Sequence, residues 1–320
     1  MARETLERCQ VWIYLGAIAA GLAIGNAWPG IGALLEMALW PCLAALLYIT
    51  FTQVPLNHLP GAFRDARFMA AVLIANFVCA PALVWGLLVV VPDQPAVKLG
   101  VLLVLLVPCT DWFITFTHLG GGDTKRAIAV TPMNLLLQLA LLPVYLWFFM
   151  GDSFAEILSA ERIALVFAAL ILMPLALAFA TEIWAERRRA RHAVVDKLAW
   201  FPVPLLALVV FLIAGSQVEA VAGSLPVLGQ VLPAFVLFLL GATLIGMLVA
   251  RLLALPEPQT RTLVLSAATR NSFVVLPFAL ALPAAWDMAV IVIVFQSLVE
   301  LFGMVAFLWF WSGRKPMMTT

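Results

Sequence analysis

Ten apolar segments, each about 20 residues or longer, constrain the fold of this chain more than any other feature. A helix needs about 20 consecutive apolar residues to cross the hydrocarbon core of a bilayer. Only helices and closed barrels satisfy their backbone groups there. We therefore predict an all-α membrane protein with ten transmembrane helices. The predicted spans are 9–27, 33–52, 68–91, 96–118, 127–150, 162–182, 198–217, 228–251, 260–283 and 286–311.

The composition excludes a soluble globular domain. Hydrophobic residues make up 65% of the chain and charged residues 11%, whereas soluble domains have about 25% charged residues. The formal net charge is +1, so no charge excess indicates a nucleic acid partner. The four cysteines form no CxxC pair, which argues against a disulfide framework or a zinc site. No GxxxxGK[ST] motif is present, and we expect neither an enzyme nor a cofactor or resident metal.

Basic residues are distributed unequally between alternate connections. With the N-terminus inside, 15 of the 18 Lys and Arg residues fall on the cytoplasmic side, Lys98 and Arg162 fall outside, and Arg270 lies within a span. Because cytoplasmic connections carry an excess of Lys and Arg, we predict that both termini are cytoplasmic. The longest polar connection, 182–197, is expected to be a cytoplasmic loop.

The two halves of the chain resemble each other at an offset of 162 residues. This offset places Asn134 on Gln296 and Gln138 on Glu300, so a pair of polar residues at i, i+4 recurs in both halves. Five spans per half is an odd number, so the second half must be inserted upside down, as in secondary transporters with inverted repeats. We predict repeats at 1–160 and 161–320.

Two predicted spans contain polar interruptions at matching positions. Span four has Pro-Cys-Thr-Asp-Trp at 108–112, span nine has Ala-Thr-Arg-Asn-Ser at 268–272, and the offset places Pro108 on Arg270. A helix broken in hydrocarbon leaves backbone groups unpaired unless they line a polar cavity. We therefore predict a substrate-binding centre at these breaks. Its expected residues are Cys109, Thr110, Asp111, Arg270, Asn271 and Ser272, with Glu300 of span ten.

The ionisable residues deep inside the spans are Asp111, Arg270 and Glu300. A lone charge at the centre of a bilayer is costly, so we expect Arg270 to pair with Asp111, with Glu300 or with both. Two interpretations stay open at this point. The charges are either an ion pair that holds crossing helices together or groups with a role in transport.

Other polar residues near the breaks also have both structural and functional interpretations. Cys109 is either a small buried hydrophobe or a soft ligand, which selects thiophilic metals and metalloids. Asn134, Gln138 and Gln296 either join helices by hydrogen bonds or line the site. Trp112 falls in the break and is placed to wall the site.

The chain resembles the arsenical-resistance (arsenite efflux) family of the bile acid/arsenite/riboflavin transporter superfamily. The resemblance is carried by Pro-Cys-Thr at 108–110, Ser-Ala-Ala-Thr-Arg-Asn-Ser at 266–272 and Ser-Leu-Val-Glu at 297–300. It implies a bile acid sodium symporter-like fold, with a panel domain (spans one, two, six and seven), a core domain (the other spans), and spans four and nine crossing where they unwind. It also implies that Cys109 and Glu300 take part in metalloid transport.

The chain departs from that family at two positions. Asp111-Trp112 follows the cysteine where the family has small or apolar residues, and Arg270 stands where span nine has a neutral polar residue. The sodium symporters of the superfamily bind cations around this crossing, and a guanidinium there would repel sodium. We therefore expect coupling to protons.

From the residues and the resemblance together, we expect a secondary active transporter of the inner or plasma membrane that exports arsenite, or antimonite, from the cytoplasm by exchange for protons. In this scheme Cys109 is a transient arsenic ligand and Glu300 carries the proton. Thr110, Asn271 and Ser272 bind the hydroxyls of the metalloid.

Two other functions stay open. A symporter or uniporter of a small organic anion would use Arg270 as a carboxylate clamp. A receptor or scaffold would retain the fold without transport. The expected partners are the lipid bilayer, a small metalloid and the proton, with no nucleic acid, and the sequence leaves a homo-oligomer open.

Overall fold

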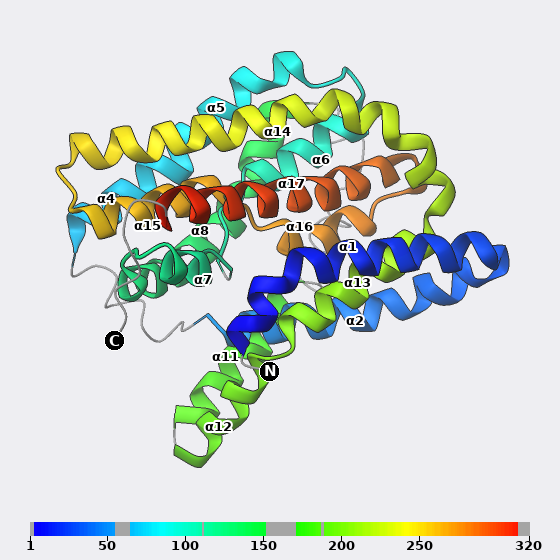
Figure 1. The fold of residues 1–320 in the computed structure, drawn as a ribbon, viewed down its shortest axis with the longest axis horizontal. Coiled ribbons are helices and arrows are strands. Elements are labelled where there is room, and N and C mark those ends of the chain that lie inside the picture. The colour runs from blue at the N-terminus through cyan, green and yellow to red at the C-terminus, as the bar shows by residue number, and fades with distance from the viewer. Residues whose placement is uncertain (1–2, 55–64, 111, 152–170, 187–188, 313–320) are drawn as a thin grey trace. The chain divides into compact units, whose positions relative to one another are not determined.

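The computed structural model describes residues 3–54, 65–110, 112–151, 171–186 and 189–312 (Figure 1). Over these ranges the regular structure is helical, apart from one isolated antiparallel bridge between Pro108 and Arg270. The prediction of an all-helical protein is therefore confirmed.

The helices follow the predicted apolar segments. Proline begins α6 and α13, where its missing N–H costs nothing because the first N–H groups of a helix lack intrahelical partners. A π-helical turn, Ala75–Cys79, joins α4 to α5. The α-helices are α1 (Arg3–Ala27), α2 (Gly32–Thr52), α4 (Ala66–Ile74), α5 (Ala80–Leu87), α6 (Pro95–Leu105), α7 (Trp112–Leu119), α8 (Thr124–Met150), α11 (Met173–Glu186), α12 (Arg189–Leu198), α13 (Pro202–Ser216), α14 (Val218–Leu252), α15 (Glu257–Ala268), α16 (Ser272–Leu280) and α17 (Asp287–Ser312).

Five helices in the described part of the chain are long and apolar enough to cross a membrane, judged by length and composition. They are Gly32–Thr52, Ala66–Val90, Thr124–Met150, Gly223–Leu252 and Ala284–Trp309. The segments predicted as spans four and nine are each divided into two shorter helices, α6 with α7 and α15 with α16. Residues 162–170 of predicted span six lie outside the described residues, and its remainder falls within α11 and the two residues before it.

One sequence prediction about local structure was wrong. The connection 182–197 was expected to be a loop, but α11 continues to Glu186 and residues Arg189–Leu198 form α12. This run is rich in Arg, Ala, Glu and Lys, which are strong helix formers. Its charge excludes it from the bilayer core but does not prevent a helix.

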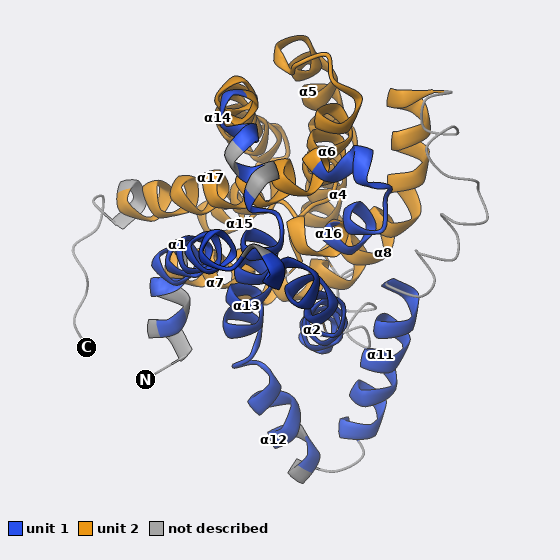
Figure 2. Cartoon of the chain, turned by 90° about the vertical axis from the view of Figure 1, so that its right-hand side faces the viewer, with its two compact units in different colours: residues 1–53, 158–226, 276–287 blue, residues 54–157, 227–275, 288–320 orange. Residues whose placement is uncertain are grey.

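The chain forms two compact units, which Figure 2 shows in blue and orange. Unit 1 comprises Met1–Gln53, Leu158–Pro226 and Leu276–Asp287, and unit 2 comprises Val54–Ile157, Val227–Val275 and Met288–Thr320. Each unit therefore takes segments from both halves of the chain.

Within unit 1, helix α13 lies against α1 and α2, and α11 lies against α2. Helices α1 and α13 meet at glycines. A Cβ atom on Gly21 would lie 2.3 Å from the main-chain oxygen of Phe211, and one on Gly25 would lie 2.3 Å from that of Gly215. Small residues let helix backbones approach closely in membranes, so a larger side chain at either position would separate α1 from α13.

Within unit 2, helix α8 packs against α6, α7 and α15. A Cβ on Gly100 of α6 would lie 2.9 Å from the Cα of Ala289 on α17, and one on Gly246 of α14 would lie 2.8 Å from the Cα of Val264 on α15. These contacts hold the divided segments against the long helices α8, α14 and α17.

Two aspartates cap helices in unit 2 and are tied together by an arginine. Asp65 accepts a hydrogen bond from the Phe68 N–H at the start of α4, and Asp123 accepts one from the Arg126 N–H at the start of α8, each at 3.1 Å. The Arg126 guanidinium contacts both carboxylates, with Nη2 2.7 Å from Asp65 Oδ2. The Phe68 N–H, with Arg126, holds the pKa of Asp65 below its usual value.

Candidate functional site

The two divided segments are joined to each other through their main chains. At the bridge between Pro108 and Arg270, the Cys109 N–H donates to Thr269 O (3.1 Å) and the Asn271 N–H donates to Val107 O (2.9 Å). All of these residues belong to unit 2. Backbone groups in a membrane need partners within the protein, and these bonds supply them where the helices stop.

The Arg270 side chain is fully buried and is directed at helix ends. Its guanidinium donates to the carbonyl of Leu105 (3.3 Å), the last residue of α6, and to that of Ala267, near the end of α15. A third bond reaches Asn76 Oδ1 at 3.1 Å, and the Phe238 ring of α14 lies 5.0 Å from the guanidinium carbon. Helix C-termini carry partial negative charge, so this single cation neutralises two of them.

Glu300 of α17 is joined to the second break through the main chain of Arg270. The Arg270 N–H donates to Glu300 Oε2 at 2.8 Å. The same oxygen accepts from Gln296 Nε2 at 2.8 Å, and Gln296 Oε1 accepts from the Ser272 hydroxyl at 2.8 Å. The expected contact between Arg270 and Glu300 thus takes the form of a main-chain hydrogen bond, while the guanidinium bonds to the helix ends.

Cys109 and Thr110 follow the first break, and both are buried. The Thr110 hydroxyl accepts a hydrogen bond from Asn271 Nδ2 at 2.8 Å, so the two breaks are also joined by side chains. Cys109 is completely buried, one residue beyond the bridge. The predicted site residue Asp111 lies outside the described residues.

The half-helices that leave the breaks are joined by an aromatic contact. Trp112, the first residue of α7, meets Phe273 of α16 edge to face, with ring centroids 5.3 Å apart. Both rings are buried. Trp112 therefore walls the region where α7 and α16 begin.

Several buried amide atoms have no hydrogen-bond partner among the described residues. Asn134 and Gln138 of α8 are 0% and 1% exposed, and neither their amide nitrogens nor their oxygens are bonded. The same holds for Asn271 Oδ1. A buried polar atom without a partner costs about 1–3 kcal/mol, and such atoms are rare in native proteins. They are therefore the groups best placed to bind a polar solute or water.

The sequence prediction missed Asn76 as a member of this site. Asn76 lies in the π-helical turn between α4 and α5, is completely buried, and accepts from Arg270 while donating to Ser266 Oγ at 3.0 Å. π-Helical turns are frequent at functional sites. A signal was present in the sequence, because Asn76 is the one amide side chain in the apolar run 68–91.

The chemistry of the site combines one thiol with hydroxyls, amides, a carboxylate and a guanidinium. Within the described ranges, no three His, Cys, Asp or Glu side chains come together to hold a metal ion. Cys109 is the soft ligand of the set, and soft ligands favour thiophilic elements. The described groups thus offer one soft ligand among hydrogen-bonding and charged groups.

A protein family and an individual protein are similar to this chain. The sequence profile of the Sodium Bile acid symporter family matches residues 40–224, which is more than half of the chain. The arsenical-resistance protein Acr3 of Corynebacterium glutamicum is 27% identical over 151 residues, covering 44% of this chain and 40% of that protein. The similarity thus spans less than half the length of this relative.

Proposed function

Because the chain belongs to the Sodium Bile acid symporter family, and is therefore a multi-pass membrane transporter, we propose that it exports arsenite from the cytoplasm in exchange for protons. The observation that carries the proposal is the position of Cys109, a buried thiol where two interrupted segments are paired. The similarity to an arsenical-resistance protein supports it. Antimonite, the heavier analogue, would bind in the same way.

We propose an architecture of ten spans in two inverted repeats, 1–160 and 161–320. The bridge between Pro108 and Arg270, which the 162-residue offset makes equivalent, supports these repeats. The division of the chain supports a panel of spans one, two, six and seven and a core of the others. Unit 1 takes Met1–Gln53 and Leu158–Pro226, and unit 2 takes Val54–Ile157. The end of span nine, within Leu276–Asp287, falls in unit 1.

The excess of Lys and Arg in alternate connections supports an inner or plasma membrane location with both termini cytoplasmic. In this orientation export starts from the side that carries most of the basic residues. The proposal does not depend on whether the protein is a monomer or a homo-oligomer.

Cys109 provides the soft ligand in this scheme. The thiol displaces one hydroxyl of arsenous acid, which forms an arsenic–sulfur bond and releases water, and attack by water reverses the step when arsenite leaves. Soft sulfur favours a thiophilic element. The remaining hydroxyls would bond to Thr110, Asn271 and Ser272, and the Oδ1 of Asn271, which is bonded to no other described residue, is an available acceptor.

Glu300 is the carboxylate proposed to carry the proton. Its Oε2 accepts from the Arg270 N–H and from Gln296. A charged carboxylate is a stronger acceptor than a neutral carboxyl, so proton uptake weakens the bond that ties α17 to the second break. Protonation and the geometry of that break are thereby coupled.

The surroundings of Arg270 disfavour two other schemes. Its guanidinium neutralises the ends of α6 and α15, a task that a bound cation would otherwise perform, so we propose that sodium takes no part. A symporter or uniporter of a small organic anion would need the guanidinium as a clamp. That function fits less well, because the group is completely buried and already bonded to three oxygens.

The test is Cys109→Ser, measured as arsenite uptake into everted vesicles from cells that lack their own exporter. We expect transport to fall by more than about tenfold, a loss of at least ~1.4 kcal/mol of transition-state stabilisation, with normal expression because the substitution changes volume little. Arsenite should also protect Cys109 of the unmutated protein from small permeant thiol reagents.

The matched control is Cys42→Ser on α2, which should transport normally. An imposed pH gradient should drive uptake and an imposed sodium gradient should not. Full transport by Cys109→Ser would reduce this thiol to packing and favour the organic-anion carrier, and sodium-driven flux would contradict the proton mechanism.

A further inference from the structure

Two large aromatic rings meet where the half-helices α7 and α16 leave the breaks. Trp112 is the first residue of α7 and Phe273 is the second residue of α16, and their ring centroids lie 5.3 Å apart at an angle of 76°. Both side chains, called the ring pair below, are buried. Rings placed edge to face at this separation are in direct contact, so no solute fits between them in this structure.

The ring pair lies close in the chain to groups that bind the substrate in the proposed scheme. Trp112 is three residues beyond Cys109, a separation of at most about 11 Å even in a fully extended chain. Phe273 is two residues beyond Asn271, whose amide donates to the Thr110 hydroxyl at 2.8 Å. The rings and the proposed substrate contacts therefore belong to the same two short stretches of chain, which the bridge between the breaks holds together.

The side of the breaks where α6 and α15 end is already filled. There the Arg270 guanidinium bonds to the carbonyls of Leu105 and Ala267. It also bonds to Asn76 Oδ1, and the Phe238 ring lies 5.0 Å from its carbon. All five side chains are buried. A bulky apolar substituent on a substrate is therefore excluded from this side, and on the side where α7 and α16 begin it meets the ring pair.

Removing one of these rings would open a space of about the size of a benzene molecule. An apolar cavity of about 150 Å³, made by one large-to-small substitution, is able to bind benzene. The indole of Trp112 is the largest kind of side chain, and the surrounding structure relaxes only partially after such a substitution. The ring pair therefore limits the size of a solute that reaches this part of the breaks.

We propose that Trp112 and Phe273 determine specificity by size, so that the site accepts arsenic that bears hydroxyl groups and rejects arsenic that bears a phenyl group. This inference rests on the proposed function, in which the Cys109 thiol binds arsenic. Phenylarsonous acid offers the same exchange to a thiol. The thiol proton joins one hydroxyl, which leaves as water, and an arsenic–sulfur bond forms. The phenyl group is the part of this molecule that the ring pair excludes.

The first measurement concerns access to the thiol and does not require transport. The full-length protein, with its three other cysteines replaced by serine, is treated with methyl or benzyl methanethiosulfonate, and intact mass spectrometry follows the modification of Cys109. Trp112→Ala and Phe273→Ala should each raise the ratio of the benzyl rate to the methyl rate by at least about tenfold, the lower end of the range for one methylene in an apolar pocket. If an alanine variant does not fold, Trp112→Leu keeps an apolar side chain in place and should still raise the ratio.

The second measurement compares substrates in everted vesicles. Uptake of arsenite and of phenylarsonous acid is measured above the background of Cys109→Ser vesicles, and the result is expressed as the ratio of the two. The unmutated protein should take up arsenite and reject phenylarsonous acid. Trp112→Ala should raise the ratio of phenylarsonous acid to arsenite by at least about tenfold.

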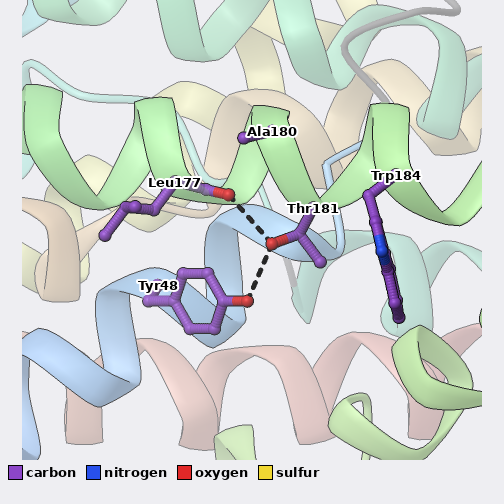
Figure 3. A pocket seen from close by; sticks show the side chains of 5 residues that line it. All are labelled: Tyr48, Leu177, Ala180, Thr181 and Trp184. Carbon is purple, nitrogen blue, oxygen red and sulfur yellow. Dashed lines mark hydrogen bonds between the residues drawn. The ribbon is translucent and has the colours of Figure 1, made fainter.

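The matched control is Trp184→Ala in unit 1. Trp184 lines a hollow of about 510 Å³ between α2 and α11 (Figure 3), so this substitution opens space away from the breaks and should leave both ratios unchanged. Unchanged ratios in Trp112→Ala and Phe273→Ala, or an equal rise in Trp184→Ala, would overturn the inference. If the unmutated protein takes up no arsenite, the proposed function fails instead, and the ratio of thiol reaction rates still decides whether the ring pair selects by size.

Discussion

The two breaks differ in how completely the neighbouring long helix satisfies them. At the break between α15 and α16, Gln296 and Glu300 of α17 bond to Ser272 and to the Arg270 N–H. At the break between α6 and α7, the corresponding pair on α8, Asn134 and Gln138, makes no hydrogen bond to any described residue. The position that pairs with Arg270 is Pro108, and proline has no N–H to offer.

This difference indicates that the two breaks, which are otherwise similar, have different roles. The second break has a cation, a carboxylate and two further side chains bonded to one another, which is typical of a fixed structural centre. The first break has the buried Cys109 thiol, and the helix α8 that packs against α6 and α7 carries two amide side chains that bond to no described residue. We infer that the first break supplies the thiol that binds the substrate, whereas the second break, apart from the contacts of Asn271 and Ser272 with the substrate, holds the crossing together and receives the proton.

The largest effect should come from Arg270→Ala, which breaks the second centre. The substitution leaves two helix ends and Asn76 without their donor, and it leaves the Glu300 charge buried without a cation. Removing one partner from a buried charged network costs about 3–5 kcal/mol. We expect low expression and a strongly lowered midpoint of thermal unfolding in detergent.

The double variant Arg270→Ala/Glu300→Gln tests whether charge balance is the reason. It should recover expression, because no uncompensated charge is left, while transport stays absent because the titratable group is gone. Arg251→Ala, at the exposed end of α14, is the control. Its free energy of unfolding should lie within about 0.5 kcal/mol of that of the unmutated protein. An Arg270→Ala protein that unfolds like the unmutated one would remove the structural role from this arginine.

The sequence predicted the positions of the helices and of both interruptions, because apolar length and polar residues within a span are local signals. It did not predict where the Arg270 side chain goes. Charge alone suggested a carboxylate partner, whereas the carbonyls at the ends of α6 and α15 become partners only when the two breaks are paired. Asn76 was missed for the same reason, since its partners are 190 and 194 residues away along the chain.

An effect of intermediate size should separate Gln138 from Gln296, which the sequence treats alike. Gln138→Met removes amide atoms that bond to no described residue, so it should cost little stability and impair arsenite transport. Gln296→Met leaves Ser272 without its acceptor and removes a donor from Glu300, so it should destabilise by about 1–3 kcal/mol. The measurements are thermal unfolding and vesicle transport on both variants.

Asn134→Leu serves as the companion to Gln138→Met, since both change amides of the same helix that bond to no described residue. The two variants should behave alike. If Gln138→Met destabilises as much as Gln296→Met and transports normally, the first break is as structural as the second, and the division of tasks is wrong.

The smallest effect is expected where comparable charges are partly exposed to water, at Asp65 and Arg126. If Arg270 is important because it is buried and not only because it is charged, a more exposed charge should contribute less. The side chain of Asp65 is 32% exposed. Asp65→Asn should therefore lower the free energy of unfolding by only about 0.2–1 kcal/mol, the range for exposed ion pairs. Asparagine still caps α4, so the substitution removes the charge and keeps the cap.

The pKa of Asp65 is lowered in the folded protein, chiefly by the Phe68 N–H. Its charge therefore contributes stability above the unfolded pKa of about 3.9, and that contribution is lost as the pH falls through the lower folded pKa. Thermal unfolding should consequently show Asp65→Asn slightly below the unmutated protein at pH 7 and indistinguishable from it once the pH is below the lowered folded pKa of Asp65. A gap that persists at low pH, or one as large as that of Arg270→Ala, would show that position and not burial decides what these charges contribute.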